Sequence, residues 1–184
     1  NLLASSGASS NKAINNIIFV NGTDFSSGAV TGGDYGIALS SDAVIRNNTL
    51  SGMFVGSAIS AGDNSVIEDN LIDAKKGYGI EASGDNVKIS GNEIHTNSSA
   101  AVRQQGKQSG IIVDRNVIVS ESGIGVYLSK SSKTKYPSDI TITNNQITTS
   151  NQYMINAADA DKDSYVIQNN TGTGKILTPS GEVD

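Results

Sequence analysis

The stretch AVIRNNTL at residues 43–50 contains the pattern that decides the fold, because it recurs along the chain. Each copy is a short alternating run of β-branched residues, then a polar pair that ends in asparagine, then usually another apolar residue. The further copies are SVIEDNLI (65–72), VKISGNEI (87–94), IIVDRNVI (111–118), ITITNNQI (140–147) and YVIQNNTG (165–172). The aligned asparagines are Asn48, Asn70, Asn92, Asn116, Asn145 and Asn170, at spacings of 22, 22, 24, 29 and 25 residues. This period predicts a stack of similar coils, which is a solenoid.

A second repeat lies about ten residues after each asparagine and predicts another strand in every coil. Its copies include SAISAG (57–62), YGIEAS (78–83), AAVRQQ (100–105), IGVYLS (124–129) and YMINAA (153–158), with YGIALS (35–40) before them. Both repeats alternate with a period of two, which is typical of strands. Stacked strands place equivalent aliphatic residues above one another, so we expect three inward columns. They are Ile45, Ile67, Ile89, Val113, Ile142 and Ile167; Leu50, Ile72, Ile94, Ile118 and Ile147; and Ile37, Ile59, Ile80, Val102, Val126 and Ile155.

The column of asparagines has a structural explanation. Asparagine tolerates the left-handed backbone that a sharp bend requires, and its amide bonds to nearby backbone. Stacked amides also hydrogen-bond to one another along the axis of the stack. We therefore assign these asparagines to the turn and not to catalysis.

Composition and charge narrow the functional classes. The 184 residues are 36% hydrophobic and 5% aromatic, which suits a narrow solenoid better than a thick globular core. A net charge of −5 argues against nucleic acid and anionic membrane surfaces as partners. The absence of cysteine excludes disulfides and thiolate zinc sites. We expect an N-terminal extension or incomplete cap (1–13), the β-helix (14–172) and a C-terminal tail (173–184). Because the chain opens on Asn1, we also expect a processed product or a fragment.

Over residues 14–172 these repeats resemble the pectate-lyase-like superfamily of right-handed parallel β-helices, which includes pectate lyases, polygalacturonases, alginate epimerases and phage tailspikes. The predicted fold is therefore all-β, a right-handed single-stranded parallel β-helix of about seven coils with an internal asparagine ladder. The resemblance implies a polysaccharide ligand, a secreted, extracellular or virion-surface location, and a homotrimer or end-to-end stacking as assembly. The chain departs from the superfamily's enzymes: it lacks their cluster of Asp with Lys and Arg and the Asp-Pro-His signature of epimerases.

Function stays open between two classes. One is a carbohydrate-active protein, tailspike-like, that binds and processes a bacterial surface or extracellular polysaccharide as a hydrolase or lyase. The other is a non-enzymatic structural shaft or a glycan-binding adhesin segment. A tight cluster of carboxylates and basic groups on one face would favour the enzyme, and the sequence shows only scattered candidates.

The first candidate site is a carbohydrate-binding column in the second repeat, formed by Glu81, Arg103 and Tyr127. Their alignment predicts that they lie on successive rungs, beside a shallow groove of small residues such as Gly79, Ala101 and Gly125. A carboxylate, a guanidinium and a ring would together suit a sugar chain. The alternative is a surface ion pair that contributes little.

Four other carboxylates are candidate catalytic residues, with Glu81 as the fifth. Asp63 and Asp85 are aligned in the turn before the first strand, in one predicted column with Asp42, Asp139 and Asp163. They would act as a proton-donating or metal-binding pair, or simply form Asx turns. Glu68 and Asp114 would be two rungs apart, about 9.6 Å along the stack. Carboxyl separations of roughly 6.5–9.5 Å occur in inverting glycosidases.

Three weaker signals remain. Asp159, Asp161 and Asp163 alternate as in a calcium loop, which makes calcium the one cofactor considered, although the glycine and glutamate of that motif are missing. The single histidine, His95, is interpreted as a surface residue. The insertion at 129–139 contains Lys130, Lys133 and Lys135, and is either a contact for an anionic polymer or a solvated loop.

Overall fold

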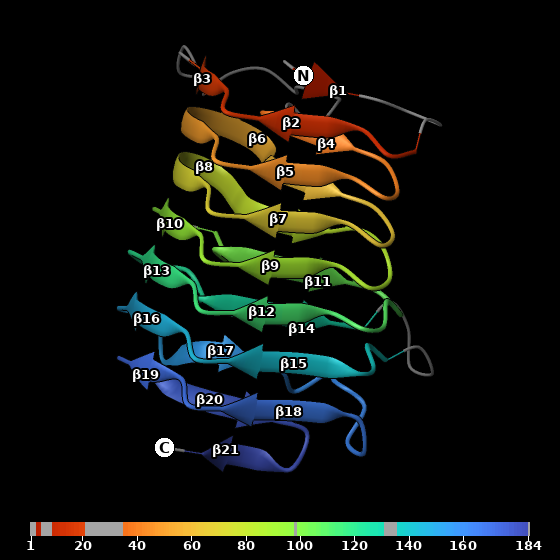
Figure 1. Cartoon of the computed structure of the whole chain (residues 1–184). Helices are drawn as coiled ribbons and strands as arrows, with labels where there is room; N and C mark the ends of the chain where they lie inside the picture. The colour runs from red at the N-terminus through yellow and green to blue at the C-terminus, as the bar shows by residue number, and fades with distance from the viewer. Residues whose placement is uncertain (1–2, 5–8, 21–34, 98, 131–135, 184) are drawn as a thin grey trace.

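The structure, a computed structural model, describes residues 3–4, 9–20, 35–97, 99–130 and 136–183. In these residues the chain winds into a stack of parallel strands and contains no helix (Figure 1). The described part of the chain therefore has no helical segment that is long and apolar enough to cross a membrane. The predicted all-β solenoid is confirmed.

One side of the stack, face 1, is a seven-stranded parallel sheet that receives one strand from each coil. Its strands are β2 (Lys12–Ile14), β5 (Val44–Arg46), β7 (Val66–Glu68), β9 (Lys88–Ser90), β12 (Ile112–Asp114), β15 (Ile140–Thr143) and β18 (Tyr165–Gln168). In Figure 1 these arrows lie one below another toward the viewer. The strand number agrees with the predicted count of about seven coils.

The other two sides belong to a 14-stranded sheet that folds around the stack. Face 2 follows the asparagine corner and holds β3 (Ile17–Val20), β10 (Glu93–Thr96), β13 (Val117–Ser120), β16 (Gln146–Thr149) and β19 (Thr171–Gly172). Face 3 holds β1 (Leu3–Ala4), β4 (Ile37–Leu39), β11 (Val102–Gln105), β14 (Val126–Ser129), β17 (Tyr153–Asn156) and β20 (Lys175–Thr178). Two long strands, β6 (Thr49–Ala61) and β8 (Leu71–Ala82), pass from face 2 to face 3 without a break.

The carboxy-terminal end departs from the parallel pattern. β20 pairs in parallel with β17, so the stack continues beyond residue 172, where the predicted β-helix stops. The last strand, β21 (Gly181–Val183), turns back and pairs antiparallel with β20. Of the N-terminal segment predicted at 1–13, residues 1–2 and 5–8 lie outside the described residues, and β2 already begins at Lys12.

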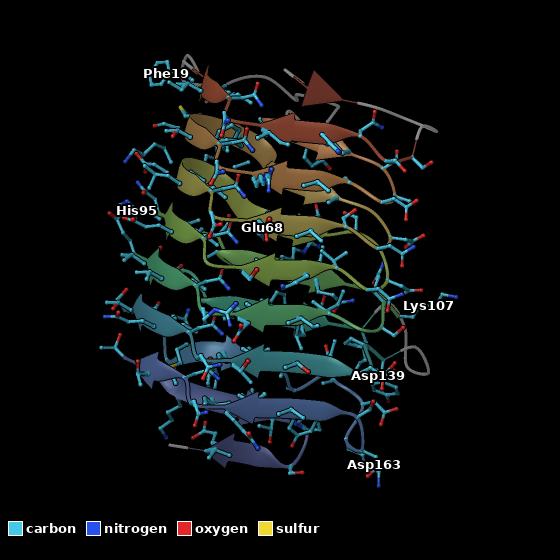
Figure 2. All side chains as sticks on the ribbon, viewed as in Figure 1. Phe19, Glu68, His95, Lys107, Asp139 and Asp163 are labelled. Atoms are coloured by element: carbon cyan, nitrogen blue, oxygen red, sulfur yellow. The ribbon has the colours of Figure 1, made fainter. Side chains whose placement is uncertain are left out.

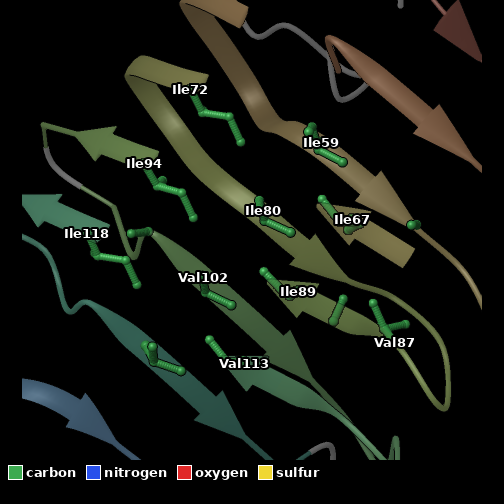
Figure 3. Packing of buried hydrophobic residues seen from close by; sticks show 14 of the residues in the cluster. Ile59, Ile67, Ile72, Ile80, Val87, Ile89, Ile94, Val102, Val113 and Ile118 are labelled. Atoms are coloured by element: carbon green, nitrogen blue, oxygen red, sulfur yellow. The ribbon is translucent and has the colours of Figure 1, made fainter. Parts of the chain in front are cut away.

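Aliphatic side chains stacked between the three faces form the core, as the repeat predicts. On face 1, Ile45, Ile67, Ile89 and Val113 are register neighbours and are fully buried. The columns of Ile72, Ile94 and Ile118 on face 2 and of Ile59, Ile80 and Val102 on face 3 meet them inside (Figure 3). Only at the last coil does Ile167 become partly exposed, because no further strand of face 1 covers it.

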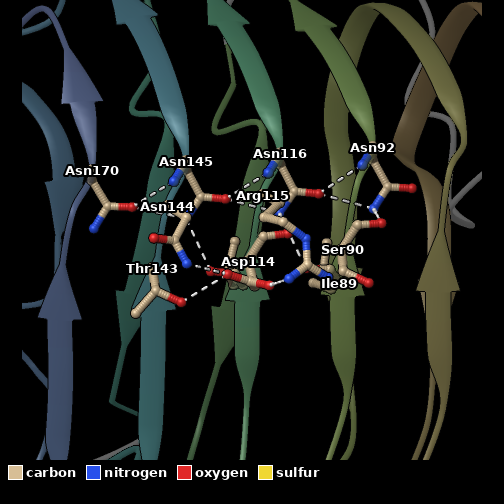
Figure 4. Close-up of polar contacts among 11 residues, drawn as sticks. Ile89, Ser90, Asn92, Asp114, Arg115, Asn116, Thr143, Asn144, Asn145 and Asn170 are labelled. Atoms are coloured by element: carbon tan, nitrogen blue, oxygen red, sulfur yellow. Dashed lines mark hydrogen bonds and ion pairs between the residues drawn. The ribbon is translucent and has the colours of Figure 1, made fainter.

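The corner between faces 1 and 2 is built from two adjacent positions. The residue before each stacked asparagine has a left-handed φ between 54° and 67°, and these residues are Asn15, Asn47, Asp69, Gly91, Arg115, Asn144 and Asn169. The stacked asparagines themselves turn inward and most are buried. The backbone N–H and the Nδ2 of Asn92 both donate to Oδ1 of Asn116, at 2.9 and 3.0 Å, and the same pattern repeats along the ladder (Figure 4). Nδ2 also donates to Ile67 O of the preceding coil at 3.0 Å. The predicted asparagine ladder is confirmed, and its bonds join three coils at a time.

We predict that Asn92→Ala lowers the free energy of unfolding by about 2–4 kcal/mol, because it leaves several buried backbone and amide groups without partners. Urea unfolding followed by circular dichroism measures this loss. Asn170→Ala is the matched control, since Asn170 is the last, partly exposed member of the ladder and should cost clearly less. Equal losses in the two variants would contradict a ladder whose strength depends on burial.

Candidate functional site

Face 3 brings the predicted carbohydrate-binding residues together. Glu81 on β8 pairs in register with Arg103 on β11, which pairs with Tyr127 on β14, so the three occupy successive rungs. Arg103 Nη1 lies 3.4 Å from Glu81 Oε1, and the two side chains are 18% and 17% exposed. The guanidinium is therefore held at the surface by a partly shielded ion pair.

Tyr78 belongs to the same cluster, although the sequence analysis did not include it. The guanidinium carbon of Arg103 lies 4.5 Å from the centroid of the Tyr78 ring, a cation–π contact. A signal was present, because tyrosine opens the second repeat in YGIALS, YGIEAS and YMINAA. Tyr78 stands three residues before Glu81 on the same strand, at the start of face 3. We call Tyr78, Glu81, Arg103 and Tyr127 the face-3 cluster.

An open hollow of about 330 Å³ lies beside the cluster, at the corner between faces 2 and 3. Tyr78 and Tyr127 border it, and apart from Ile124 its remaining lining is small or polar: Ser99, Ala100, Ser122, Gly123 and Asn151. The corner residues are fixed to one another across coils, since Asn151 Nδ2 donates to Ser122 O at 3.3 Å and Ser122 Oγ to Asn97 O at 2.8 Å. The hollow therefore offers two aromatic walls and several hydrogen-bonding groups to a polar ligand.

The predicted groove of small residues is wrong in its position. Gly79, Ala101 and Gly125 are buried. A Cβ on Gly79 or Gly125 would lie 2.5 or 2.4 Å from a methyl carbon of Ile94 or Ile147, so these positions are small because the chain bends over the core. The hollow is instead lined by the residues that immediately precede these positions in the chain, which are Tyr78, Ala100 and Ile124.

Asp63 and Asp85 act as caps for the turns between faces 3 and 1. The N–H of Asp85 donates to Asp63 Oδ1 at 2.8 Å, and the N–H of Ser109 donates to Asp85 Oδ1 at 2.8 Å. Each carboxylate therefore has a structural partner in the backbone of the next coil, and these bonds differ from the local bonds of the Asx turns that the sequence suggested.

The single predicted aspartate column splits into two adjacent columns in the structure. Asp42 N–H donates to Asp63 O, which places Asp42 one position further along the turn than Asp63. Asp42 aligns with Asn64, Asn86 and Asp139, which all have a left-handed φ of 52–57°. Figure 2 shows Asp139 and Asp163 at these turns, on the right of the view. The sequence alignment merged the columns because neighbouring turn positions both favour Asp and Asn.

Glu68 and Asp114 lie on face 1, two rungs apart as predicted, with the buried Ser90 between them. Figure 2 labels Glu68 on this face, and Figure 4 shows Asp114 below the asparagine ladder. Asp114 Oδ1 accepts hydrogen bonds from Asn144 Nδ2 at 2.8 Å and Thr143 Oγ1 at 2.9 Å. Neither carboxylate is near the face-3 cluster, because a different sheet holds them.

The surroundings of Asp114 favour its ionised form. Burial raises the pKa of this carboxyl, but the hydrogen bonds from Asn144 and Thr143, with the charges of Arg115 and Lys88, outweigh burial and hold the pKa below its ordinary value. Arg115 Nη1 lies 2.7 Å from Asp114 Oδ2. A carboxyl with a lowered pKa is a poor proton donor near neutral pH. Asp114 therefore fits a role in fixing the corner better than general acid catalysis.

The three aspartates of the predicted calcium loop do not converge on one point. Asp159 Oδ1 lies 2.7 Å from Lys130 Nζ, Asp161 Oδ1 accepts the N–H of Asp163 at 3.1 Å, and Asp163 faces Lys162. No group of three or more Asp, Glu, His or Cys side chains in the described ranges is placed to share a metal ion. The loop geometry therefore gives no support to calcium here. Of the insertion at 129–139, Lys133 and Lys135 lie outside the described residues.

His95 lies on face 2 (Figure 2), and its ring has a carboxylate on each side. Its Nδ1 is 3.5 Å from Asp73 Oδ1, and its Nε2 is 3.3 Å from Glu121 Oε1. The prediction of a surface histidine agrees with its 37% exposure, but the sequence did not indicate these partners. They come from neighbouring coils, so only the register of the stack brings them to the ring.

Comparisons with known proteins give the family and nothing finer. The sequence model of one protein family, described as the right handed beta helix region, matches residues 6–172. No curated protein and no solved structure matches the chain.

We predict that Asp114 contributes to stability above about pH 5 and that this contribution is lost as the pH falls through its lowered folded-state pKa, below the ordinary value near 3.9. Asp114→Asn should therefore unfold more easily at neutral pH and lose less stability on acidification than the wild type. Urea unfolding across pH 7 to about pH 2.5 checks this.

Thr143→Val is the control for that experiment, because it removes only one of the hydrogen bonds to the carboxylate. It should reduce the acid dependence in the same direction but by a smaller amount. An acid dependence that is unchanged in Asp114→Asn would show that other groups dominate.

Proposed function

The chain belongs to the right-handed β-helix family, and we propose that within this family it binds an extended bacterial surface or extracellular polysaccharide outside the cell or on a virion. One observation carries the proposal: Tyr78, Arg103, Glu81 and Tyr127 are gathered on face 3 beside an open hollow lined with hydroxyl and amide groups. The fold is consistent with a carbohydrate-related protein and does not by itself specify one.

The chemistry of the cluster suits a sugar ring. A pyranose has apolar C–H faces, which pack against aromatic rings such as Tyr78 and Tyr127, and a rim of hydroxyl groups. Glu81 can accept hydrogen bonds from such hydroxyls, while Arg103 donates to their oxygens. Charged partners make these hydrogen bonds stronger than neutral ones. Glu81 and Arg103 can bond to the hydroxyl groups of a neutral sugar, and Arg103 can also bind the carboxylate of an acidic sugar.

The scaffold keeps the cluster in place before a ligand arrives. Glu81, Arg103 and Tyr127 stand on neighbouring strands of one sheet, so the backbone ladder fixes their spacing at about 4.8 Å per rung. The contacts of Arg103 with Glu81 and Tyr78 restrict its rotamers further. Less conformational entropy is lost on binding when the contacting groups are already ordered.

Binding is supported better than catalysis. Glycoside hydrolysis usually needs two carboxyls, one on each side of the reacting bond. Among the predicted catalytic residues only Glu81 stands in the face-3 cluster. Asp63 and Asp85 cap backbone amides at another corner, and Glu68 and Asp114 lie on face 1. We therefore propose a glycan-binding protein ahead of a hydrolase, a lyase or an inert shaft.

We predict that Tyr127→Ala weakens binding of a responsive polysaccharide by about tenfold, which corresponds to about 1.4 kcal/mol, because one aromatic wall of the hollow is lost. A panel of soluble neutral, acidic and capsular polysaccharides, tested by affinity electrophoresis and then calorimetry, identifies the ligand and measures the change. Val119→Ala is the control, since Val119 is 40% exposed on face 2 and should leave binding unchanged.

The same panel decides between the functional classes. Incubation of each polysaccharide with the protein is followed by reducing ends and by the ultraviolet absorbance of unsaturated uronates. We expect binding without new products. Reducing ends alone would indicate a hydrolase, and reducing ends with absorbance would indicate a lyase. Failure of every polysaccharide to bind would favour the structural shaft.

A further inference from the structure

A second hollow lies at the other edge of face 3, where the chain turns back toward face 1. It encloses about 410 Å³, within the range of small-molecule sites, and four of its six lining residues are apolar or aromatic. The lining comes from three separate segments of the chain: Tyr136; Ala158, Ala160, Asp161 and Lys162; and Pro179. No feature of the sequence repeat predicts it, because its walls are irregular turns.

Hydrogen bonds fix the walls of this hollow. The N–H of Asp161 donates to Pro137 O at 2.7 Å, which ties the segment after β17 to the one before β15. In the β20–β21 turn, Thr178 Oγ1 donates to Gly181 O at 2.9 Å and holds Pro179 in place. Lys130 pairs with Asp159 at 2.7 Å and also lies 5.4 Å from the Tyr136 ring centroid, so it positions the ring. The hollow is therefore preformed.

The lining combines methyl groups with two charged groups. Ala158 presents an exposed methyl group, Pro179 a pyrrolidine ring and Tyr136 an aromatic face, while Ala160 lies at the base of the hollow with only 2% of its surface exposed. Asp161 can accept a hydrogen bond from an N–H group, and Lys162 can donate one to a carbonyl oxygen. The hydroxyls of a plain hexose would leave the methyl-lined part without a suitable partner. A flat amide that ends in a methyl group matches the lining in three ways. Its methyl group suits the apolar part, its N–H group suits Asp161, and its carbonyl oxygen suits Lys162.

We infer that this hollow binds the acetamido group of an N-acetylated sugar unit in the polysaccharide that the face-3 cluster holds. The inference rests on the proposed function and specifies its ligand class. The methyl group packs against Ala158 and Pro179, the sugar ring lies on Tyr136, and the amide bonds to Asp161 and Lys162.

Strand β14 connects this hollow to the first one. Tyr127 borders the first hollow, and Lys130, which positions Tyr136, follows three residues later, immediately after the same strand ends at Ser129. Three residues of strand span roughly 10 Å. One glycan chain can therefore contact both hollows if it runs along the strands, across the axis of the stack.

The test compares two oligosaccharides that differ only at the position of interest. The probes are the β-1,4-linked tetramers of N-acetylglucosamine and of glucose, titrated against the full chain by calorimetry. The wild type should bind the acetylated tetramer at least about tenfold tighter than the glucose tetramer. Ala158→Phe should abolish this preference, because Ala158 is exposed and a phenylalanine there fills the hollow without disturbing the core. Ala158→Ser, which keeps the hollow open, is the matched control and should retain the preference.

Each other outcome is decisive. Equal binding of the two tetramers, no binding of the acetylated tetramer, or a preference that survives in Ala158→Phe would overturn the assignment of this hollow. The proposed function is judged separately, by the polysaccharide panel and by Tyr127→Ala. If Tyr127→Ala weakens binding while Ala158→Phe does not, the cluster binds glycan and the second hollow plays no part. An unchanged circular dichroism spectrum of Ala158→Phe shows that the variant folds.

Discussion

The hydrogen bonds between equivalent positions of successive coils are the constraint on which the rest of the structure depends. They include the parallel ladders of the three faces and the asparagine ladder at one corner. Asparagine suits this corner because its side-chain amide both donates and accepts hydrogen bonds. Within the ladder, the Oδ1 of each Asn accepts two bonds from one neighbour, and its backbone N–H and Nδ2 donate two bonds to the next. A buried corner without such a residue would leave backbone N–H groups such as that of Asn70 without their acceptor.

This constraint also explains where variation is tolerated. The coil length changes between consecutive asparagines, from 22 to 29 residues, yet the strands on either side of the longest coil keep their register on faces 1 and 2. The extra residues enter the turns, where no ladder has to be continued. Both hollows lie at such turns, and regular strands beside the first one supply Tyr78 and Tyr127 to its lining. A rigid stack with variable corners is a common arrangement for binding sites.

The same logic explains why three of the five predicted catalytic carboxylates make structural contacts between coils. In a parallel stack each corner exposes backbone N–H groups, and a carboxylate from the neighbouring coil can accept their hydrogen bonds. Asp63 and Asp85 accept such backbone bonds, whereas Asp114 accepts bonds from the side chains of Thr143 and Asn144 in the next coil. Glu81 differs because its partner Arg103 also contacts Tyr78, which borders the first hollow. A sugar hydroxyl can share that partner without breaking the backbone ladder.

The sequence by itself determined the strands, the inward columns and the asparagine ladder, because each depends on residue type repeated at a fixed spacing. It also placed Glu81, Arg103 and Tyr127 on successive rungs, since aligned repeats are stacked repeats. It could not separate Asp42 from the column of Asp63, because one step of register in a turn leaves the hydrophobic pattern unchanged. Only the tertiary structure decided the contact of Tyr78 with Arg103, the carboxylates on either side of His95, and the hollow between Tyr136 and Pro179. These contacts depend on side-chain direction and on the path of irregular turns, and neither follows from periodicity.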